Sequence, residues 1–121
     1  MASRLHHIVV DSADPGRLAR FWARVLDYDI LFEDEEEVII GHSGDTWPGL
    51  CFLPVPEEKA GKNRLHLDLA PDDRDAEVAR ILALGAHRAD VGQGPEVSWV
   101  VLADPEGNEF CVLRPKKSLT D

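Results

Sequence analysis

The stretch that decides the fold is DPEGNEFCVLRP, residues 104–115. Asp104-Pro105 and Gly107-Asn108 favour a tight turn, because Pro presets its own backbone angle and Gly and Asn tolerate left-handed conformations. The residues that follow, EFCVLR, are typical of a short strand. The stretch therefore predicts a turn leading into a last strand. It also places a cysteine, Cys111, on that strand, and the turn residues are expected to shape the backbone and not to react.

The rest of the chain predicts the order strand, helix, strand, strand, strand, twice. In the first copy Asp14 and Pro15 suit the start of a helix, and the strands are expected at 5–10, 28–33, 37–41 and 50–55. In the second copy a helix over 71–85 ends at Gly85, and the strands are expected at 64–70, 86–91, 97–103 and 109–114. A polar linker over 56–63 joins modules at about 4–55 and 64–115 in a chain of 121 residues, which is expected to form one domain.

The two copies also echo each other in sequence. His7 precedes Asp14 by seven residues, and His66 precedes Asp73 by seven. LCFL in the first copy corresponds to FCVL in the second. The shared order of elements and the shared residues together indicate an internal repeat.

Three stretches carry a resemblance to the vicinal oxygen chelate superfamily, which includes glyoxalase I, extradiol dioxygenases and bleomycin-resistance proteins. HIVVDSADPGRLARFWARVLDY resembles the opening module, HLDLAPDD the start of the second module, and DPEGNEFCVL the closing signature. The chain is closest to the short glyoxalase-like domains of that superfamily. The resemblance implies an α+β fold, with two tandem βαβββ modules forming a curved eight-stranded mixed sheet, and it implies a homodimer.

The resemblance also implies where a metal would bind. In metal-binding members the ligands come from the first strand of each module and from a last strand, which carried over by position gives His7 and His66. The last-strand ligand is normally a Glu seven residues after the Asp of the turn, and here that position holds Cys111. The equivalent first-module position holds Cys51. The implied set is therefore His7, His66 and Cys111, with Cys51 as a fourth candidate, and it departs from the family pattern by lacking the carboxylate.

Strand alternation groups the same residues independently of the resemblance. Along 64–70, three leucines share one face, which is expected to pack under the helices, and His66 and Asp68 share the other. Alternation likewise pairs His7 with Asp11, and Cys111 with Glu109. These polar faces are expected to line the pocket, whereas His6 is expected to face away from His7.

Three hypotheses about the site stay open. The first is a metal site, with zinc as the ion that suits His and Cys ligands, acting as a Lewis acid if one position is open. The second, which we favour, is a pocket without a cofactor, in which the histidines are pocket residues or a general base oriented by Asp68 or Asp11. In that case the two cysteines are small buried side chains.

The third hypothesis is a binding protein without catalysis, similar to the bleomycin-resistance members. Trp47 and Trp99 occupy similar places in the two modules, and either could stack on a flat cationic ligand, whereas Trp22 belongs to the apolar face of the first helix. Asp11 and Glu109 would then join them as ligand-binding residues.

If the chain is an enzyme, the resemblance implies a lyase or isomerase. The missing Glu argues against ordinary glyoxalase I activity. It also argues against extradiol ring cleavage, which needs two His and one carboxylate on iron.

Composition limits the partners. The net charge of −10, from 13 basic and 23 acidic residues, argues against nucleic acid and fits a solubilising surface or a cationic ligand. No apolar run is long enough to span a bilayer and no signal peptide follows Met1, so a cytoplasmic protein is expected. The densest acidic run, EDEEE at 33–37, is expected at a solvated hairpin tip.

Overall fold

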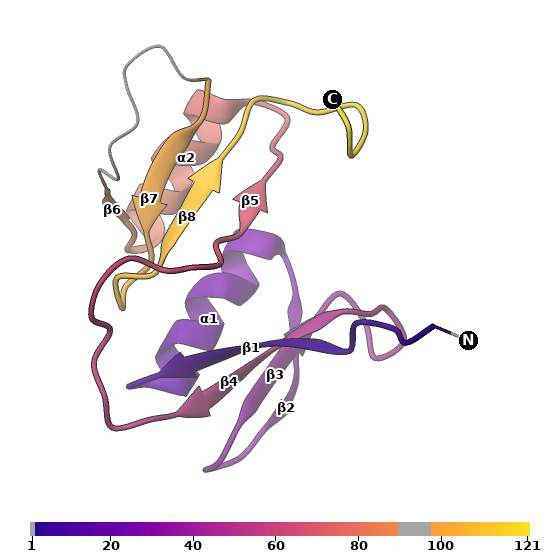
Figure 1. The fold of residues 1–121 in the computed structure, drawn as a ribbon, viewed down its shortest axis with the longest axis vertical. Coiled ribbons are helices and arrows are strands. Elements are labelled where there is room, and N and C mark those ends of the chain that lie inside the picture. The colour runs from indigo at the N-terminus through magenta and orange to yellow at the C-terminus, as the bar shows by residue number, and fades with distance from the viewer. Residues whose placement is uncertain (1, 90–97) are drawn as a thin grey trace. The chain divides into compact units, whose positions relative to one another are not determined.

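The structure is a computed structural model that describes residues 2–89 and 98–121. The chain divides into two compact units, Met1–Glu58 and Lys59–Asp121, and each is described by itself. Within the described residues, each unit has one helix and four strands in the order βαβββ (Figure 1). The α+β class and the two tandem modules predicted from the sequence are therefore confirmed, and the eight strands form two mixed sheets of four. No helix in the described ranges is long and apolar enough to cross a membrane.

The first unit is built around a sheet with the strand order β1-β4-β3-β2. β1 runs parallel to β4, and the other neighbours are antiparallel. Its elements are β1 (His7–Ser12), α1 (Pro15–Leu26), β2 (Asp29–Glu33), β3 (Val38–Gly41) and β4 (Gly49–Pro54).

Helix α1 begins and packs as its sequence predicts. Asp14 caps it by accepting a hydrogen bond from the Arg17 amide, and Pro15 occupies the first turn, where no amide donor is needed. Its apolar face is buried together with one face of the sheet, and this core includes Leu18, Phe21, Trp22, Val25, Ile40 and Phe52. Trp22 is thus a core residue, as expected.

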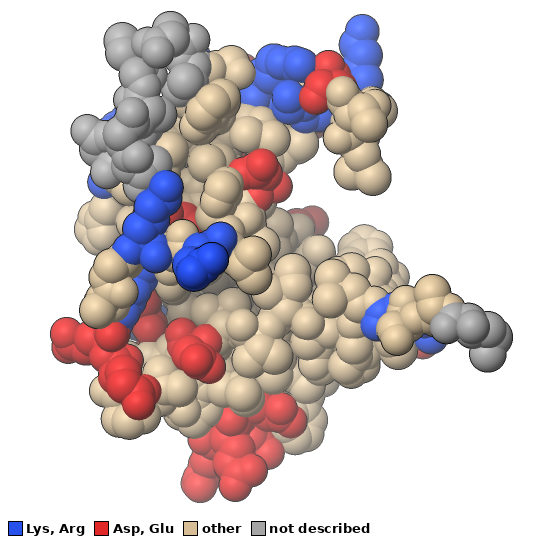
Figure 2. Space-filling model, viewed as in Figure 1, with Lys and Arg blue, Asp and Glu red and all other residues tan. Residues whose placement is uncertain are grey.

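The acidic run forms the turn between β2 and β3, where Figure 2 shows acidic side chains gathered. The Asp34 carboxylate accepts hydrogen bonds from the amides of Glu36 and Glu37 at 2.8 and 2.9 Å, which closes the turn. The expected solvated hairpin tip is therefore present. Glu37 is the member of the run that is half-buried.

The second unit repeats the plan with shorter strands. Its sheet has the order β5-β8-β7-β6, with β5 parallel to β8 and the other neighbours antiparallel. Its elements are β5 (Asp68–Leu69), α2 (Arg74–Leu84), β6 (His87–Arg88), β7 (Val100–Ala103) and β8 (Glu109–Val112). Asp73 caps α2 and Gly85 ends it in a positive-φ conformation, so the repeated Asp14 and Asp73 are both helix caps.

One predicted strand is much shorter than expected. The sequence predicts a strand over 64–70, but only Asp68 and Leu69 pair, with Cys111 and Val112. If the same register continued towards the N-terminus, Leu65 would lie opposite Asn108. Asn108 belongs to the turn before β8, so Leu65 has no strand residue to pair with. Leu65 is 86% exposed, so the expectation that it packs under a helix is wrong. Parts of the strands expected at 86–91 and 97–103 lie outside the described residues.

The turn at 104–108 is stabilised from inside by Asp104, which is buried. Its carboxylate accepts hydrogen bonds from the amides of Glu106 and Asn108, both at 2.9 Å, and from the Asn108 side chain. Gly107 has φ 89°, a region that Gly enters without steric cost. The motif is therefore a structural turn that leads into β8, as its sequence indicates.

Candidate functional site

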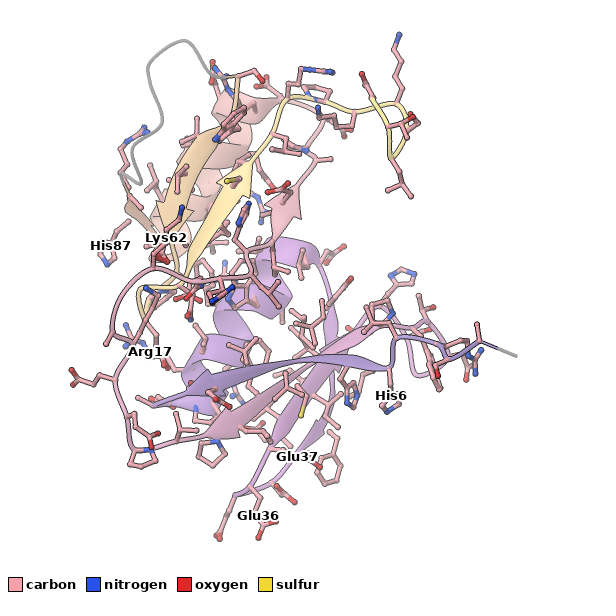
Figure 3. The ribbon with its side chains drawn as sticks, viewed as in Figure 1. His6, Arg17, Glu36, Glu37, Lys62 and His87 are labelled. Atoms are coloured by element: carbon pink, nitrogen blue, oxygen red, sulfur yellow. The ribbon has the colours of Figure 1, made fainter. Side chains whose placement is uncertain are left out.

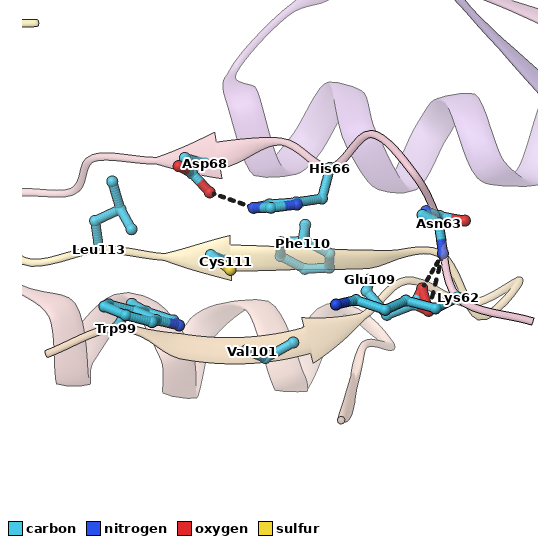
Figure 4. Close-up of a pocket in the computed structure, with 10 residues that line it drawn as sticks. All are labelled: Lys62, Asn63, His66, Asp68, Trp99, Val101, Glu109, Phe110, Cys111 and Leu113. Carbon is cyan, nitrogen blue, oxygen red and sulfur yellow. Dashed lines mark hydrogen bonds and ion pairs between the residues drawn. The ribbon is translucent and has the colours of Figure 1, made fainter. Parts of the chain in front are cut away.

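The described part of the second unit contains a pocket of about 480 Å³ on the sheet face opposite α2 (Figure 4). It lies over β5, β8 and β7 and is open to solvent on one side. The residues that line it are Lys62, Asn63, His66, Asp68, Trp99, Val101, Glu109, Phe110, Cys111 and Leu113. This set includes five of the residues singled out from the sequence.

Strand pairing explains why these side chains meet. Cys111 pairs with Asp68 on one side and with Val101 on the other, so the three side chains form a row across the sheet. On β8, Glu109 is two positions from Cys111 and points the same way. His66 and Trp99 precede β5 and β7, and both line the pocket beside these strands. The opposite face carries Leu102, Phe110 and Val112, which are buried in the core.

His66 and Asp68 form a pair at the pocket wall. His66 Nε2 lies 3.2 Å from Asp68 Oδ1, and both side chains are about half exposed. A proton on Nε2 would face the carboxylate and would leave Nδ1 as the acceptor. In the described ranges Nδ1 has no hydrogen-bond partner, so it is available to a ligand.

Cys111 lies beside this pair and is buried. Burial raises the pKa of its thiol, and the charge and hydrogen bond of Asp68 raise it further, while Lys62 acts weakly in the opposite direction. The thiol is therefore kept protonated at neutral pH. Without a metal it is not an activated nucleophile.

The same three residues could hold a metal ion. One ligand atom each from His66, Asp68 and Cys111 lie within 4.8 Å of one another. A nitrogen, an oxygen and a sulfur donor suit zinc, whereas manganese and magnesium prefer oxygen donors. The carboxylate that the sequence lacks at position 111 is thus supplied by the neighbouring strand, from Asp68.

Glu109 is already engaged within the second unit. Its carboxylate lies 3.0 Å from Lys59 Nζ and accepts from the Asn63 amide at 3.4 Å. Burial acts to raise the pKa of Glu109, but the hydrogen bonds outweigh it and the pKa is lowered. Glu109 lines the pocket, yet its charge is balanced before any ligand arrives.

The two tryptophans differ in surroundings. Trp99 is 39% exposed and lines the second-unit pocket, so its ring can contact a ligand. Trp47 lies in the first unit, where the Arg4 guanidinium is 4.1 Å from its ring and His6 meets it edge-on at 4.5 Å. That face of Trp47 is therefore occupied by the protein's own side chains.

The remaining predicted residues belong to the first unit. His7 lies against Gly49, and burial and the neighbouring His6 lower its pKa while Glu37 opposes them. The His6 ring is 4.0 Å from that of His7, so the expectation that they face apart is wrong, because His6 precedes β1 and does not follow its alternation. Asp11 is exposed on β1.

Cys51 has its own carboxylate neighbour, which the sequence did not reveal. Its Sγ lies 3.6 Å from Glu37 Oε2, and burial and this contact raise the pKa of the thiol (Figure 3 labels Glu37). The set His7, Cys51, His66 and Cys111 is divided between the two units, so the metal set implied by the resemblance stays a prediction. In the first unit the hairpin register, in which Ile39 pairs with Cys51, puts Glu37 on the thiol's face.

Comparison with known proteins now gives the family. Residues 7–113 match the model of the glyoxalase-like domain, and the chain therefore belongs to the glyoxalase-like family. This match confirms the glyoxalase-like domain that the motifs predict. No curated protein matches the sequence.

Three solved structures show the same fold at low identity. A glyoxalase/bleomycin resistance protein/dioxygenase family enzyme from Burkholderia phytofirmans is 18% identical, with a TM-score of 0.75 over 94% of this chain and 100% of that one. The fosfomycin resistance protein FosX from Listeria monocytogenes, a mutant complexed with Mn(II) and 1S,2S-dihydroxypropylphosphonic acid, is 17% identical, with a TM-score of 0.74 over 96% and 93%. TnmS3, an antibiotic binding protein from a Streptomyces species, is 19% identical, with a TM-score of 0.62 over 95% and 98%. Because these structures include an enzyme and a binding protein, the fold alone does not decide the role, which depends on the site.

Proposed function

We propose that this chain binds a small organic molecule in the second-unit pocket and that His66, oriented by Asp68, moves a proton on it in a lyase or isomerase reaction. The observation that supports the proposal is the His66–Asp68 contact of 3.2 Å at the wall of an open pocket. The carboxylate fixes one ring nitrogen as donor, and the other can accept a proton from a carbon next to a carbonyl. The apolar walls around Trp99 and Leu113 would exclude water from the ligand's other side.

A metal is a compatible addition to this site. Zinc would be held by His66, Asp68 and Cys111, and when bound it would polarise a ligand oxygen. Metal content of the untagged protein, measured by mass spectrometry, tests this: about one zinc per chain that is lost in Cys111→Ser supports it. No zinc after incubation with the metal contradicts it, and it leaves the acid–base proposal in place.

The acid–base proposal is tested by proton exchange. The protein is incubated in D₂O with a panel of α-hydroxy ketones, 2-oxo acids and thioesters, and loss of the α-proton is followed by NMR. We expect exchange on at least one class, reduced by about 10²–10⁴ in His66→Asn. His87→Asn is the control, because His87 is exposed on β6 and does not line the pocket. Equal exchange in wild type and His66→Asn, or none above buffer on any class, overturns the proposal.

The same proposal excludes ordinary glyoxalase I activity. That reaction uses the Glu whose position is filled by Cys111, and Glu109 is two residues away along β8, about 6.6 Å, too far to fill the same place. Measurable turnover of the methylglyoxal–glutathione hemithioacetal would contradict this part.

A second candidate is sequestration of a flat cationic compound, without catalysis. It is favoured by the exposed ring of Trp99 in a pocket that also holds the Asp68 carboxylate. An acridine dye is a suitable probe: stoichiometric quenching of Trp fluorescence that is lost in Trp99→Leu, with the dye recovered unchanged, supports it. Quenching that survives in Trp99→Leu rejects it.

The proposal includes a cytoplasmic homodimer. The family resemblance supports the dimer, and the low number of cysteines, two in the chain, is compatible with a reducing compartment. Light scattering of the purified protein tests the dimer, and a mass of one chain would contradict it.

A further inference from the structure

The charged side chains around the second-unit pocket are paired, with one exception. Lys59 pairs with Glu109 and also donates to the Gly61 carbonyl, and His66 pairs with Asp68. Lys62 lines the same pocket, yet in residues 2–89 and 98–121 its ammonium has no hydrogen-bond or ion-pair partner. The pocket thus holds a cation whose counter-charge the described chain does not supply.

The Lys62 ammonium lies where a ligand would meet it. Figure 4 shows its side chain running beside Glu109 with the ammonium directed into the pocket. Its charge is also felt at the sulfur of Cys111, because it opposes the increase in the thiol pKa that burial, first, and Asp68 produce. Lys62 is therefore part of the pocket's electrostatics, although its backbone belongs to the segment that leads into β5.

The pocket is polarised along its length. Figure 4 places Asp68 at the Trp99 and Leu113 end and Lys62 at the Glu109 end. The lining is also apolar, through Val101 on β7 and through Trp99 and Leu113 at the Asp68 end (Figure 4). An elongated molecule with one negative end and an apolar body would have its charge attracted by Lys62 and repelled by Asp68.

We infer that Lys62 is the counter-charge for an anionic group of the ligand, and that the pocket takes an organic anion with a flat or apolar body. The inference rests on the ligand site of the proposed function and adds the chemical class of the ligand. It also fixes the orientation, with the anionic group at Lys62 and the apolar body against Trp99, within reach of His66. A cationic ligand, as in the second candidate, would be repelled at the Lys62 end.

The test uses three probes with one ring system: 2-naphthoate, 2-naphthamide and 2-naphthylmethylammonium. Binding is followed by the NMR shifts of the Trp99 indole N–H and of the β8 amides. We expect the anion to bind about two- to fivefold more tightly than the neutral amide, the scale of one exposed ion pair, and the cation to bind most weakly. Raising the salt concentration should weaken binding of the anion and leave the amide unchanged.

Variants at Lys62 separate charge from shape. Lys62→Met keeps the length of the side chain and should bring the anion to the affinity of the amide, without changing the amide. Lys62→Arg should restore the preference. Lys117→Met, in the C-terminal segment outside the pocket lining, is the matched control and should behave as wild type.

Any of three results overturns the inference. The anion and the amide bind equally well; Lys62→Met weakens binding of all three probes equally; or no probe shifts the NMR signals of the pocket. Its failure is distinguishable from that of the proposed function. A charge preference that depends on Lys62, together with no proton exchange by His66, would leave the anion subsite standing and reject the acid–base role. Proton exchange without any charge preference would do the reverse.

Discussion

Replacing Asp68 by Asn should make Cys111 more reactive toward iodoacetamide, because the thiolate is the reacting form. Burial is the largest cause of the raised pKa of Cys111, and the charge and hydrogen bond of Asp68 follow it. The substitution removes the charge and leaves the burial almost unchanged, since Asn has nearly the same shape. The pKa of Cys111 should therefore fall towards its ordinary value but stay above it.

The size of the effect follows from the separation of the two groups. The ligand atoms of Asp68 and Cys111 lie within 4.8 Å. A carboxylate and a thiolate at that separation repel each other by about 0.9 kcal/mol at the dielectric constant of water, which suits Asp68 because it is half exposed. That energy corresponds to about a four- to fivefold change in the thiolate population. Alkylation at pH 7.5 to 8 should accelerate by about that factor.

The first unit supplies the control inside the same molecule. Cys51 has a carboxylate neighbour of its own, Glu37, at 3.6 Å. Asp68→Asn should therefore leave the alkylation rate of Cys51 unchanged, and Glu37→Gln should raise the rate of Cys51 alone. Peptide mapping by mass spectrometry measures both sites in each sample. An unchanged or slower rate at Cys111 in Asp68→Asn would refute the electrostatic reasoning, and equal acceleration at both cysteines would point to unfolding.

Three further outcomes concern stability and pH. Gly49→Ala should lower the free energy of unfolding by about 1–3 kcal/mol in a urea titration, because a Cβ there would lie 2.9 Å from the Ile40 carbonyl oxygen; unchanged stability would contradict this close approach. Asp104→Ala should cost about 1–3 kcal/mol in the same assay, because it leaves two partly buried amide donors of the turn without their acceptor, and a cost below about 0.5 kcal/mol would show that the turn does not need these bonds. The pKa of Asp121 is lowered to about 2, first by its hydrogen bond with Arg114 and then by the Lys117 amide. The contact between Asp121 and Arg114 should therefore be fully formed above pH 3.8 and should be lost as the pH falls through about 2. An NMR titration of the Asp121 carboxyl checks this, and a midpoint near 3.8 would show that the ion pair does not persist in solution.

The helices and the turn could be predicted because their signals are local. Asp14 and Asp73 are caps whose partners lie three residues along the chain, and Asp104 closes its turn with residues two and four positions away. Such contacts depend on spacing alone, so the sequence determines them without knowledge of the fold. The length of β5 could not be predicted in this way, because it depends on pairing with β8, which lies about 40 residues further along the chain.

The site was predictable where alternation along a strand applies. The repeat selects His66 and Cys111, strand parity adds Asp68, and the ligand atoms of the three residues lie close together. Lys62 could not be found in this way, since it lies in a segment without regular structure. The contact of Glu37 with Cys51 could not be predicted for another reason. An acidic run is normally exposed to solvent, and only the register of the hairpin places Glu37 beside the cysteine.

The short length of β5 affects which substitutions this protein can tolerate during evolution. The segment that carries Lys62, Asn63 and His66 has backbone bonds to the sheet at its end only, through the pairing of β5 with β8 and the bond from the Cys111 amide to the Leu67 carbonyl. Its other hydrogen bond to the sheet joins the Asn63 amide to the side chain of Glu109. Few buried contacts depend on the identity of its side chains, so substitutions there should cost little folding free energy. One wall of the pocket can thus accumulate mutations that alter ligand preference, while the core on the other face of the sheet keeps the domain folded. During selection for a new ligand, we therefore expect the first substitutions to occur in this segment.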